Sequence, residues 1–278
     1  MRHWSYAKGH GTENDFVLLL DREGMLEVSE AEVRFLCDRH AGIGADGLLR
    51  AVLAKQVPEW RGDGDLWFMD YRNADGSIAE TCGNGLRVFV RYLLQQDLAV
   101  GPMVPVATRA GLREATALPD GRIRVEMGPV SVEDRHVCVQ TADGKQFGAL
   151  TGHVGNPHAV AFTDDLDRLQ LHAAPNWAPM DAYPAGANIE FVRILGSRHI
   201  AMRVYERGVG ETRSCGTGTV AAAAAARLHT DDEASLPVSY LVDVPRGRVE
   251  VELTDTQAFL TGPAVLVAYG EVAIPEEG

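Results

Sequence analysis

The feature that most constrains this chain is a short pattern that occurs twice: a cysteine followed by Gly-x-Gly at the start of a helix-like segment. The first copy is TCGNGLRVFVRYLL, from Thr81 to Leu94, and the second is SCGTGTVAAAAAARL, from Ser214 to Leu228. The alanine run of the second copy combines high helix propensity with small volume, so it predicts a helix that packs closely against strands. Two copies of one thiol-bearing helix start indicate an internal duplication.

Other matches fall in a common register. GHGTENDFV aligns with GHVGNPHAV, which places Asn14 and Asn156 142 positions apart, and the same offset relates Asp46 of Gly-Ala-Asp to Asn188 of Gly-Ala-Asn. An offset of 133 positions relates Met69, Asn73 and Cys82 to Met202, Glu206 and Cys215. The difference between the two offsets falls in AKQVPEWRGDGD, a polar stretch that predicts a longer surface connection in the first half.

Hydrophobic patterning predicts many strands and few helices. Alternating or β-branched runs that predict strands are DFVLLL, DLWFMDY, RIRVEM, AVAFT, IEFVRI, IAMRVYE, SYLVDV, RVEVEL and AVLVAYGEVAI. Ser29 and Glu32 form a capping box before AEVRFLCDRH, and the two Cys-Gly-x-Gly segments open the other helices. We therefore expect an α+β fold of two pseudo-symmetric domains of similar fold. A turn signal near Pro119 places the boundary there, with residues 1–118 in the N-terminal half and 119–262 in the C-terminal half.

Composition excludes several classes of protein. With 278 residues, 46% of them hydrophobic, the chain has enough apolar residues for real cores. A net charge of −13 without long like-charge runs argues against a nucleic-acid partner or an anionic membrane surface. The start MRHWSYAKGHG lacks the apolar core of a secretory signal, so we expect a cytoplasmic protein. Phosphate-loop and zinc-binding motifs are missing from the sequence, and we expect neither a nucleotide nor a metal site.

A cysteine at a helix start has a distinctive chemistry. The first turn of a helix offers unpaired N–H groups and the positive end of the macrodipole, which favour a thiolate. The adjacent Gly83-Asn84-Gly85 and Gly216-Thr217-Gly218 segments are expected to hold a carboxylate with main-chain donors. The alternative is that each cysteine is a small buried residue, but packing alone does not require sulfur beside glycines in both halves. Cys37 and Cys138 lack this setting, and we expect both in the core.

Two such thiols suit either a redox pair or an acid and a base on opposite sides of one carbon. The second option fits inversion at the α-carbon of an amino acid, because one thiolate removes the proton while the opposite thiol delivers another. Helix donors would stabilise the charge that grows on the carboxylate. The lysines, Lys8, Lys55 and Lys145, have no setting typical of a Schiff base, so we expect no cofactor.

The segments NADGSIAETCGNGLR, GNPHAV, ANIEFV and ERGVGETRSCGTG resemble the signature segments of the diaminopimelate epimerase family. These cofactor-independent isomerases interconvert L,L- and meso-diaminopimelate in lysine and peptidoglycan-precursor biosynthesis. The resemblance runs in the same order from KGHGTENDF to GPAVLVAYGE. It implies that Cys82 accepts the proton and Cys215 donates one, with the roles exchanged in reverse. It also implies an active site in the cleft between the domains, a return of residues 263–278 to the first domain, and a homodimer.

The resemblance also assigns the other site residues. It implies that His158 and Glu206 adjust the pKa values of the two thiols. The residues that it implies in substrate binding are Asn14, Asn73, Gly83, Asn84, Asn156, Asn188, Glu206, Arg207, Gly216 and Thr217. Their chemistry agrees, because an arginine holds a distal carboxylate in bidentate fashion and a glutamate pairs with an ammonium group. The alternatives are a solvated Glu206–Arg207 surface pair, a structural His158, and asparagines that shape turns.

Two departures from the family pattern and two other functions stay open. Thr12 and Glu13 precede Asn14, where many members have Leu-Gly, and Gly47 stands where many have glutamine, so contact between position 47 and the substrate is unsettled. One alternative function is an isomerase of the same fold that acts on proline or hydroxyproline. The other is a thiol redox switch whose working state is a Cys82–Cys215 disulfide, which we otherwise expect as an inactivating side product.

Overall fold

The computed structural model describes residues 2–80 and 82–275, except for the side chains of 134–136, and divides the chain into two compact units. Unit 1 consists of Met1–Val125 and Pro263–Gly278, and unit 2 of Glu126–Gly262. The turn that the sequence predicted near Pro119 forms the hairpin between two strands of unit 1, where Gly121 N donates to Leu118 O at 2.9 Å. The division between the units therefore follows that turn.

Unit 1 is a mixed sheet with two helices. Its strands are β1 (Arg2–Gly11), β2 (Asn14–Leu20), β3 (Gly47–Leu53), β4 (Trp67–Asn73), β5 (Met103–Thr108), β6 (Gly111–Ala117), β7 (Ile123–Gly128, which continues into unit 2) and β18 (Val265–Ile274). Pairing follows the order β18-β1-β2-β3-β4-β5-β6-β7, with β2–β3 and β4–β5 parallel. Helices α1 (Glu30–Cys37) and α2 (Gly83–Gln95) make these two parallel crossovers. The 3-10 helix η1 (Ala54–Gln56) begins the polar connection predicted in this half.

Unit 2 repeats this plan. Its strands are β8 (Ser131–Gln140), β9 (Gln146–His153), β10 (Pro157–Phe162), β11 (Asn176–Ala178), β12 (Asn188–Gly196), β13 (His199–Glu206), β14 (Gly210–Thr212), β15 (Val238–Val244), β16 (Gly247–Leu253) and β17 (Ala258–Gly262). The central order is β8-β9-β10-β12-β13-β15-β16-β17, with β10–β12 and β13–β15 parallel. Helix α3 (Gly216–His229) crosses from β14 to β15, and the 3-10 helices are η2 (Leu166–Arg168) and η3 (Met180–Ala182).

The strand registers of the two units can be compared residue by residue. Phe16 of β2 pairs with Gly9 and Gly47, and His158 of β10 pairs with Gly152 and Asn188. Phe16 and His158 are therefore equivalent. Asn188 consequently matches Gly47 rather than Asp46, which corrects the sequence alignment by one residue. An alignment across loops of unequal length cannot resolve such a slip, whereas a ladder of hydrogen bonds does.

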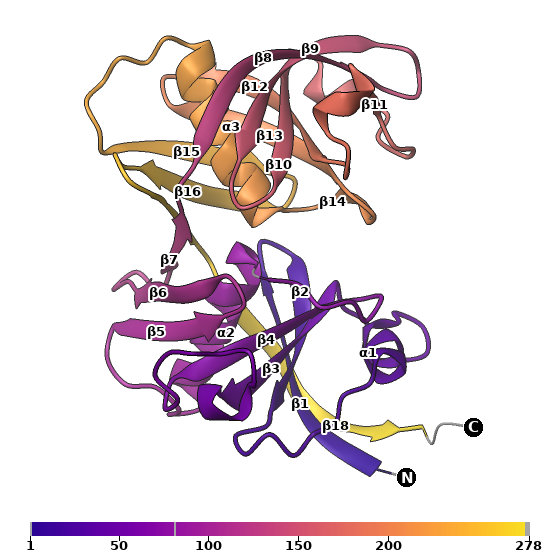
Figure 1. Cartoon of the computed structure of the whole chain (residues 1–278), viewed down its shortest axis with the longest axis vertical. Helices are drawn as coiled ribbons and strands as arrows, with labels where there is room; N and C mark the ends of the chain where they lie inside the picture. Colours follow the sequence, from indigo (N-terminus) through magenta and orange to yellow (C-terminus); the bar gives the residue numbers. More distant parts are fainter. Residues whose placement is uncertain (1, 81, 276–278) are drawn as a thin grey trace. The chain divides into compact units, whose positions relative to one another are not determined.

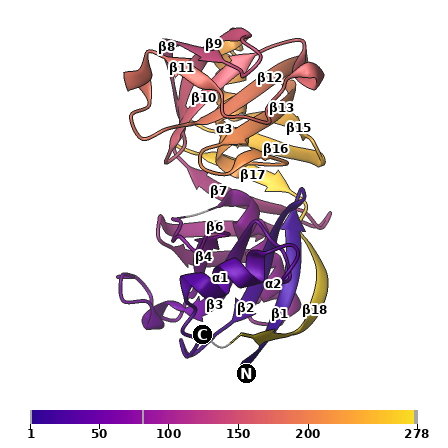
Figure 2. The same ribbon diagram turned by 90° about the vertical axis from the view of Figure 1, so that its right-hand side faces the viewer.

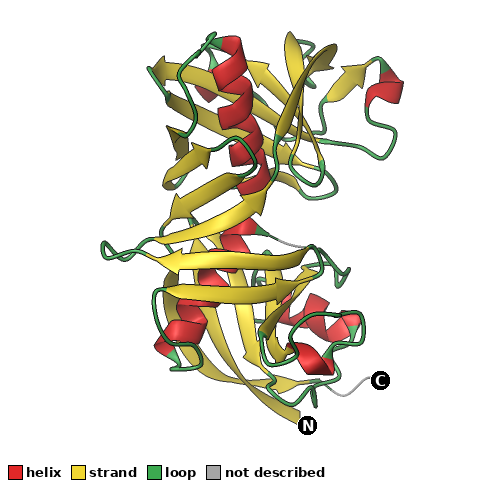
Figure 3. Ribbon diagram, turned by 60° about the vertical axis from the view of Figure 1, so that its left-hand side comes forward, coloured by secondary structure: helices red, strands yellow, loops and turns green. Residues whose placement is uncertain are grey.

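The long helix of each unit is buried against the sheet. Helix α2 contacts β1, β2, β3, β4, β6 and β18, and its residues from Gly83 to Val90 are all buried. Helix α3 contacts β8, β9, β10, β12 and β13, and five of its six consecutive alanines, all but Ala224, are fully buried. This close packing confirms the role predicted for the alanine run. Strands are the predominant regular elements of both units (Figures 1 and 3), and β18 lies beside β1 along its length (Figure 2).

The first helix confirms the predicted capping box. Glu32 N donates to Ser29 Oγ at 3.3 Å and Ser29 N donates to Glu32 Oε2 at 2.8 Å. The helix ends at Cys37, earlier than the pattern AEVRFLCDRH suggested, because Asp38 takes an extended conformation. Among the described residues, none of the helices is long and apolar enough to cross a membrane.

Candidate active site

Each of the two cysteines singled out by the sequence is the N-cap of a long buried helix. Cys82 caps α2 and its Sγ accepts a hydrogen bond from Gly85 N at 3.4 Å. Cys215 caps α3 and its Sγ accepts from Gly218 N at 3.4 Å. Both cysteines take an extended conformation, with ψ of 119° in each case. Each sulfur therefore occupies the position where a helix offers unpaired N–H groups and positive potential.

Three predicted residues of unit 1 meet at the start of α2. Asn14 Oδ1 lies 3.8 Å from Cys82 Sγ and accepts a hydrogen bond from Asn84 Nδ2 at 3.2 Å. Asn14 Nδ2 donates to Asp46 Oδ2 at 2.8 Å, so its amide is fixed from both sides. Burial raises the pKa of Asp46, and the hydrogen bond from Asn14 partly offsets the rise. Asn73 lies at the end of β4, where its Nδ2 donates to Ser77 Oγ at 3.0 Å.

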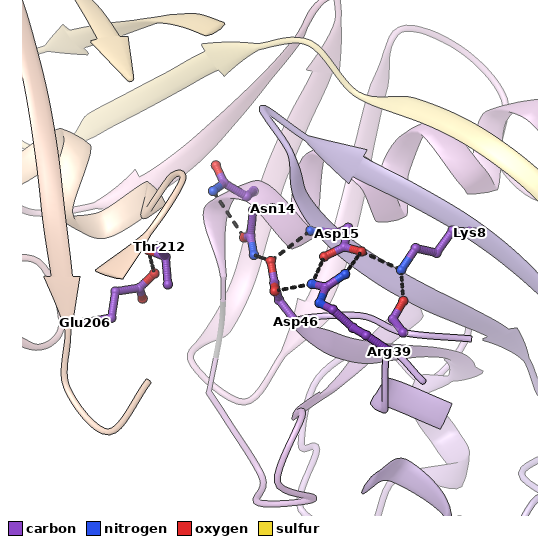
Figure 4. Close-up of polar contacts among 9 residues, drawn as sticks. Lys8, Asn14, Asp15, Arg39, Asp46, Glu206 and Thr212 are labelled. Carbon is purple, nitrogen blue, oxygen red and sulfur yellow. Dashed lines mark hydrogen bonds and ion pairs between the residues drawn. The ribbon is translucent and has the colours of Figure 1, made fainter. Parts of the chain in front are cut away.

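A network of ion pairs holds the loop that carries Asn14 in place (Figure 4). Arg39 contacts both Asp46 and Asp15 at 2.7 Å, and Lys8 Nζ lies 2.6 Å from Asp15 Oδ2. Burial raises the pKa of Asp15, but hydrogen bonds and charge from Arg39 and Lys8 outweigh it and lower that pKa to about 2. The loop that carries Asn14 is thus tied down by ion pairs, and Lys8 is engaged in one of them.

In unit 2 the equivalent asparagine, Asn156, is held by a buried hydrogen-bond network instead of by partly exposed ion pairs. His158 is fully buried, with Nδ1 2.7 Å from Glu190 Oε1 and Nε2 2.9 Å from Asn156 Oδ1. These two contacts fix the ring and orient the Asn156 amide. Glu190, which is also fully buried, is not among the site residues predicted from the sequence. The available signal was a charged residue inside the apolar strand run IEFV, where a buried carboxylate is costly without a partner.

The electrostatic surroundings of Cys215 oppose its ionisation. Burial raises the pKa of Cys215 well above its ordinary value, and the negative charges of Glu206 and Glu190 raise it further. Thr212 Oγ1 donates a hydrogen bond to Glu206 Oε1 (Figure 4). Hydrogen bonds from Thr217 and from Gly218 N act in the opposite direction. Cys215 is therefore a thiol surrounded by acidic groups at a helix start.

Arg207 is positioned by its backbone and by its aliphatic stem. Arg207 N donates to Asn188 Oδ1 at 2.9 Å, and Nη1 donates to Ala185 O at 2.8 Å. A Cβ at Gly186, whose φ is +82°, would lie 2.7 Å from Arg207 Cδ. Arg207 is exposed and forms no ion pair within residues 2–80 and 82–275. Its guanidinium group thus keeps donors for an anionic ligand, which argues against the solvated Glu206–Arg207 pair.

The remaining sequence predictions have separate outcomes. Gly83, Asn84 and Gly216 are buried in the first turns of their helices, and Thr217 is half-buried. Cys37 is buried as expected, and burial raises its pKa to about 12. Cys138 is half-buried on β8. At Gly47 a Cβ would lie 2.8 Å from Tyr71 Cε2, so the Tyr71 ring fills the space where a side chain at position 47 would begin.

Solved structures share this architecture over nearly the whole chain. A phenazine biosynthesis protein of the PhzF family from Bacillus anthracis has a TM-score of 0.74 at 16% identity, covering 99% of this chain and 100% of that chain. A hydroxyproline epimerase from Agrobacterium vitis has a TM-score of 0.72 at 16% identity, with coverages of 99% and 94%. The chain therefore belongs to the class of α+β proteins that share this two-unit fold.

Sequence comparison identifies the family within that class. The family model described as diaminopimelate epimerase matches residues 6–133 and 151–267. A diaminopimelate epimerase from Streptomyces coelicolor is 48% identical over 274 residues, covering 96% of this chain and 94% of that protein. Another from Thermobifida fusca is 48% identical over 276 residues, with coverages of 97% and 98%. The chain belongs to the diaminopimelate epimerase family.

Proposed function

We propose that this protein interconverts L,L- and meso-diaminopimelate with two thiols, one of which removes the α-proton while the other delivers a different proton. The observation that supports this most is the matched pair of N-cap cysteines, because Cys82 and Cys215 have the same helix position and the same hydrogen bond to the third residue after them. Family membership supplies the substrate, since the relatives at 48% identity are named for it.

The reaction needs one base and one acid on opposite faces of the α-carbon. In the direction from L,L- to meso-diaminopimelate, the Cys82 thiolate removes the α-proton and the Cys215 thiol delivers its own proton to the other face. Cys82 ends as a thiol and Cys215 as a thiolate, so the proton count is balanced and the roles exchange in the reverse reaction. The scheme uses no cofactor.

Charge develops on the substrate carboxylate as the α-proton leaves. We assign its stabilisation to main-chain N–H groups of Gly83 and Asn84 in one unit and of Gly216 and Thr217 in the other, because a helix start carries positive potential. The oriented amides of Asn14 and Asn156 suit the same role, since Asn14 is fixed by the half-buried Asp46 and Asn156 by the buried His158.

The far end of the substrate carries a second carboxylate and a second ammonium group. We assign the carboxylate to Arg207, whose guanidinium donors are available, and the ammonium to Glu206 with help from Asn73 and Asn188. A homodimer in the cytoplasm is part of the proposal by family resemblance, and sedimentation equilibrium of the purified protein tests the dimer.

Proton exchange with solvent tests the two-thiol scheme directly. In deuterium oxide, the wild-type protein is expected to convert L,L-diaminopimelate with incorporation of deuterium at the α-carbon, without added cofactor. Both Cys82→Ala and Cys215→Ala should lose epimerisation, whereas Cys138→Ala should retain it. Loss of exchange in Cys82→Ala but full activity in Cys215→Ala would contradict two bases.

Two further assays separate the alternatives. Parallel reactions with proline and hydroxyproline test whether the protein is an isomerase of one of these substrates. Turnover of either at the rate of diaminopimelate would contradict the proposed substrate. Free-thiol titration during treatment with oxidant tests the redox switch. Activity is expected to fall as thiols are lost, and an oxidised protein with full activity would favour the switch.

A further inference from the structure

The side chains that contact the first turns of α2 and α3 occupy equivalent positions in the two units but differ in charge. In unit 1, a Cβ at Gly85 would lie 3.4 Å from Phe16 Cζ and 3.4 Å from Leu49 Cδ2, so the helix start rests on apolar groups. In unit 2, a Cβ at Gly218 would lie 2.4 Å from Glu190 Oε1. The strand registers make His158 the equivalent of Phe16, and they make Glu190 the equivalent of Leu49.

The buried carboxylate of Glu190 reaches the neighbourhood of Cys215. The point where a Cβ of Gly218 would sit is 2.4 Å from Glu190 Oε1 and 3.3 Å from Cys215 Sγ. Glu190 Oε1 is paired with His158, which offsets part of its charge, but Oε2 is buried without a hydrogen-bond partner among the described residues. Glu190 and Glu206 thus both act on Cys215 from adjacent strands.

Unit 1 has a buried cation instead. Arg87 lies on α2, is fully buried, and forms no ion pair within the part of the chain that the structure describes. Its Nη2 is 3.4 Å from Thr12 Oγ1, its Nε donates to Pro263 O at 3.3 Å, and its Nη1 has no hydrogen-bond partner among residues 2–80 and 82–275. The matching position of α3 is Val220, which is also fully buried.

Arg87 lies in the helix that Cys82 caps, and its Nη2 is 3.4 Å from Thr12 Oγ1 in the loop whose Asn14 Oδ1 is 3.8 Å from Cys82 Sγ. Burial lowers the pKa of Arg87 to about 10, and the charge of Cys82 opposes that change. The Asp46 carboxyl is hydrogen-bonded to Asn14, and burial raises its pKa. A cation in a low-dielectric setting favours an adjacent thiolate, whereas an anion disfavours one.

From this contrast we infer that Arg87 and Glu190 are positioning residues of opposite sign, which hold Cys82 as the thiolate and Cys215 as the thiol in the resting protein. The inference deepens the proposed function and rests on its two-thiol reaction. The duplication supplied two similar helix starts, and these two buried side chains make them unequal. The resting enzyme thereby holds one base and one acid instead of two equal thiols.

The test measures each thiol by itself. Intact protein is alkylated with iodoacetamide across a range of pH, and the extent of alkylation is read by mass spectrometry on the peptides that contain Cys82 and Cys215. In the wild-type protein, the midpoint of reaction is expected at lower pH for Cys82 than for Cys215. This comparison needs no variant. The pH midpoint depends on the ionisation of each thiol, whereas the rate reached at high pH depends on how accessible the sulfur is to iodoacetamide.

Variants identify the residues responsible. Glu190→Gln should move the Cys215 midpoint to lower pH, raise its alkylation at pH 8 by about tenfold, and leave Cys82 unchanged. Arg87→Met should move the Cys82 midpoint to higher pH, whereas Arg87→Lys should stay close to wild type. Glu233→Gln, which removes an exposed charge from unit 2, is the matched control and should change neither midpoint.

The outcomes separate the inference from the proposed function. Equal midpoints in the wild-type protein, or a Cys215 midpoint unmoved in Glu190→Gln, would overturn the inference even if diaminopimelate is turned over. Suppose instead that the midpoints differ and respond to both variants, but the protein does not turn over diaminopimelate. This result would support the inferred difference in ionisation between Cys82 and Cys215 and would overturn the proposed substrate. Circular dichroism on each variant confirms that the folded state is being compared.

Discussion

Phe16 and His158 occupy the same position in the two units, since each pairs with a glycine on one neighbouring strand, Gly9 or Gly152. Both side chains are fully buried, yet one is an apolar ring and the other is an imidazole bound to a carboxylate. The duplicated framework therefore holds an apolar side chain at this position in one unit and a buried polar network in the other. Buried polar networks are costly unless every member is paired.

Copying the apolar pair of unit 1 into unit 2 tests what this network contributes. His158→Phe alone leaves the Glu190 carboxylate buried without its partner, and we expect the free energy of unfolding to fall by about 3–5 kcal/mol. The double variant His158→Phe, Glu190→Leu, which copies Phe16 and Leu49, should recover most of that loss. Urea unfolding measures both values. If the single and double variants were equally unstable, the buried charge would not be the cause.

The second glycine of each Cys-Gly-x-Gly pattern is predicted to differ in its tolerance of alanine. A Cβ at Gly218 would lie 2.4 Å from Glu190 Oε1, so Gly218→Ala must displace a buried carboxylate. We expect a loss of about 1–3 kcal/mol of stability and a large loss of turnover. At Gly85, the nearest atoms would be 3.4 Å away, an ordinary contact, and Gly85→Ala should fold with nearly unchanged stability. Thermal unfolding compares the two, and equal shifts would contradict this account.

Local patterns explain why much of the site was predictable. The Ser29 capping box and both cysteine N-caps depend on residues three positions apart, and each forms as the sequence indicated. Their hydrogen bonds close within one helical turn, so neighbouring residues suffice to predict them. The duplication was also readable, because the matched segments keep their order and each span has a constant offset, 142 positions for Asn14 and Asn156 and 133 for Cys82 and Cys215.

The residues that the sequence did not reveal depend on distant pairing. Glu190 meets His158 because β10 and β12 pair in parallel, and those residues are 32 positions apart. Asn188 matches Gly47 and not Asp46 because hydrogen-bond registers, and not loop lengths, set the correspondence. Arg87 lies in the buried part of α2, and no spacing rule predicts a buried arginine that forms no ion pair with the residues that the structure describes.

Arg207 is expected to determine affinity for the far end of the substrate. Arg207→Met should raise KM for diaminopimelate by about 100-fold with a smaller effect on kcat, because a bidentate contact to a carboxylate is lost. Gly186→Ala should act in the same direction, since its Cβ would displace the Arg207 stem and its φ of +82° disfavours a side chain. Initial-rate kinetics measure both variants. An unchanged KM in Arg207→Met would remove the distal-carboxylate role.

Acid should remove the contribution of Asp15 to stability. The pKa of Asp15 is lowered to about 2 in the folded protein, against about 3.9 in an unfolded chain, so its stabilisation is fully present above pH 4 and is lost as the pH falls through 2. We expect Asp15→Asn to cost about 2 kcal/mol at pH 7 and about half as much at pH 3. Urea unfolding at both pH values measures the difference. A cost that does not change with pH would contradict the lowered pKa.

Asn14 is expected to control the ionisation of Cys82, because its Oδ1 lies 3.8 Å from the sulfur and its Nδ2 binds Asp46. Asn14→Asp keeps the shape of the side chain but adds a carboxylate between Asp46 and the thiol, and a nearby negative charge disfavours a thiolate. Activity at neutral pH should fall about 100-fold, with partial recovery at higher pH as Cys82 ionises.

The pH profile distinguishes this electrostatic effect from simple distortion of the loop. If Asn14→Asp only disturbed packing, the activity loss would be the same at every pH, and the Cys82 alkylation midpoint would stay at its wild-type value. Asn14→Ser, which removes the contact to Asp46 without adding charge, is the matched control. It should lower activity but leave the position of the pH profile unchanged, because a hydroxyl group adds no charge beside the sulfur.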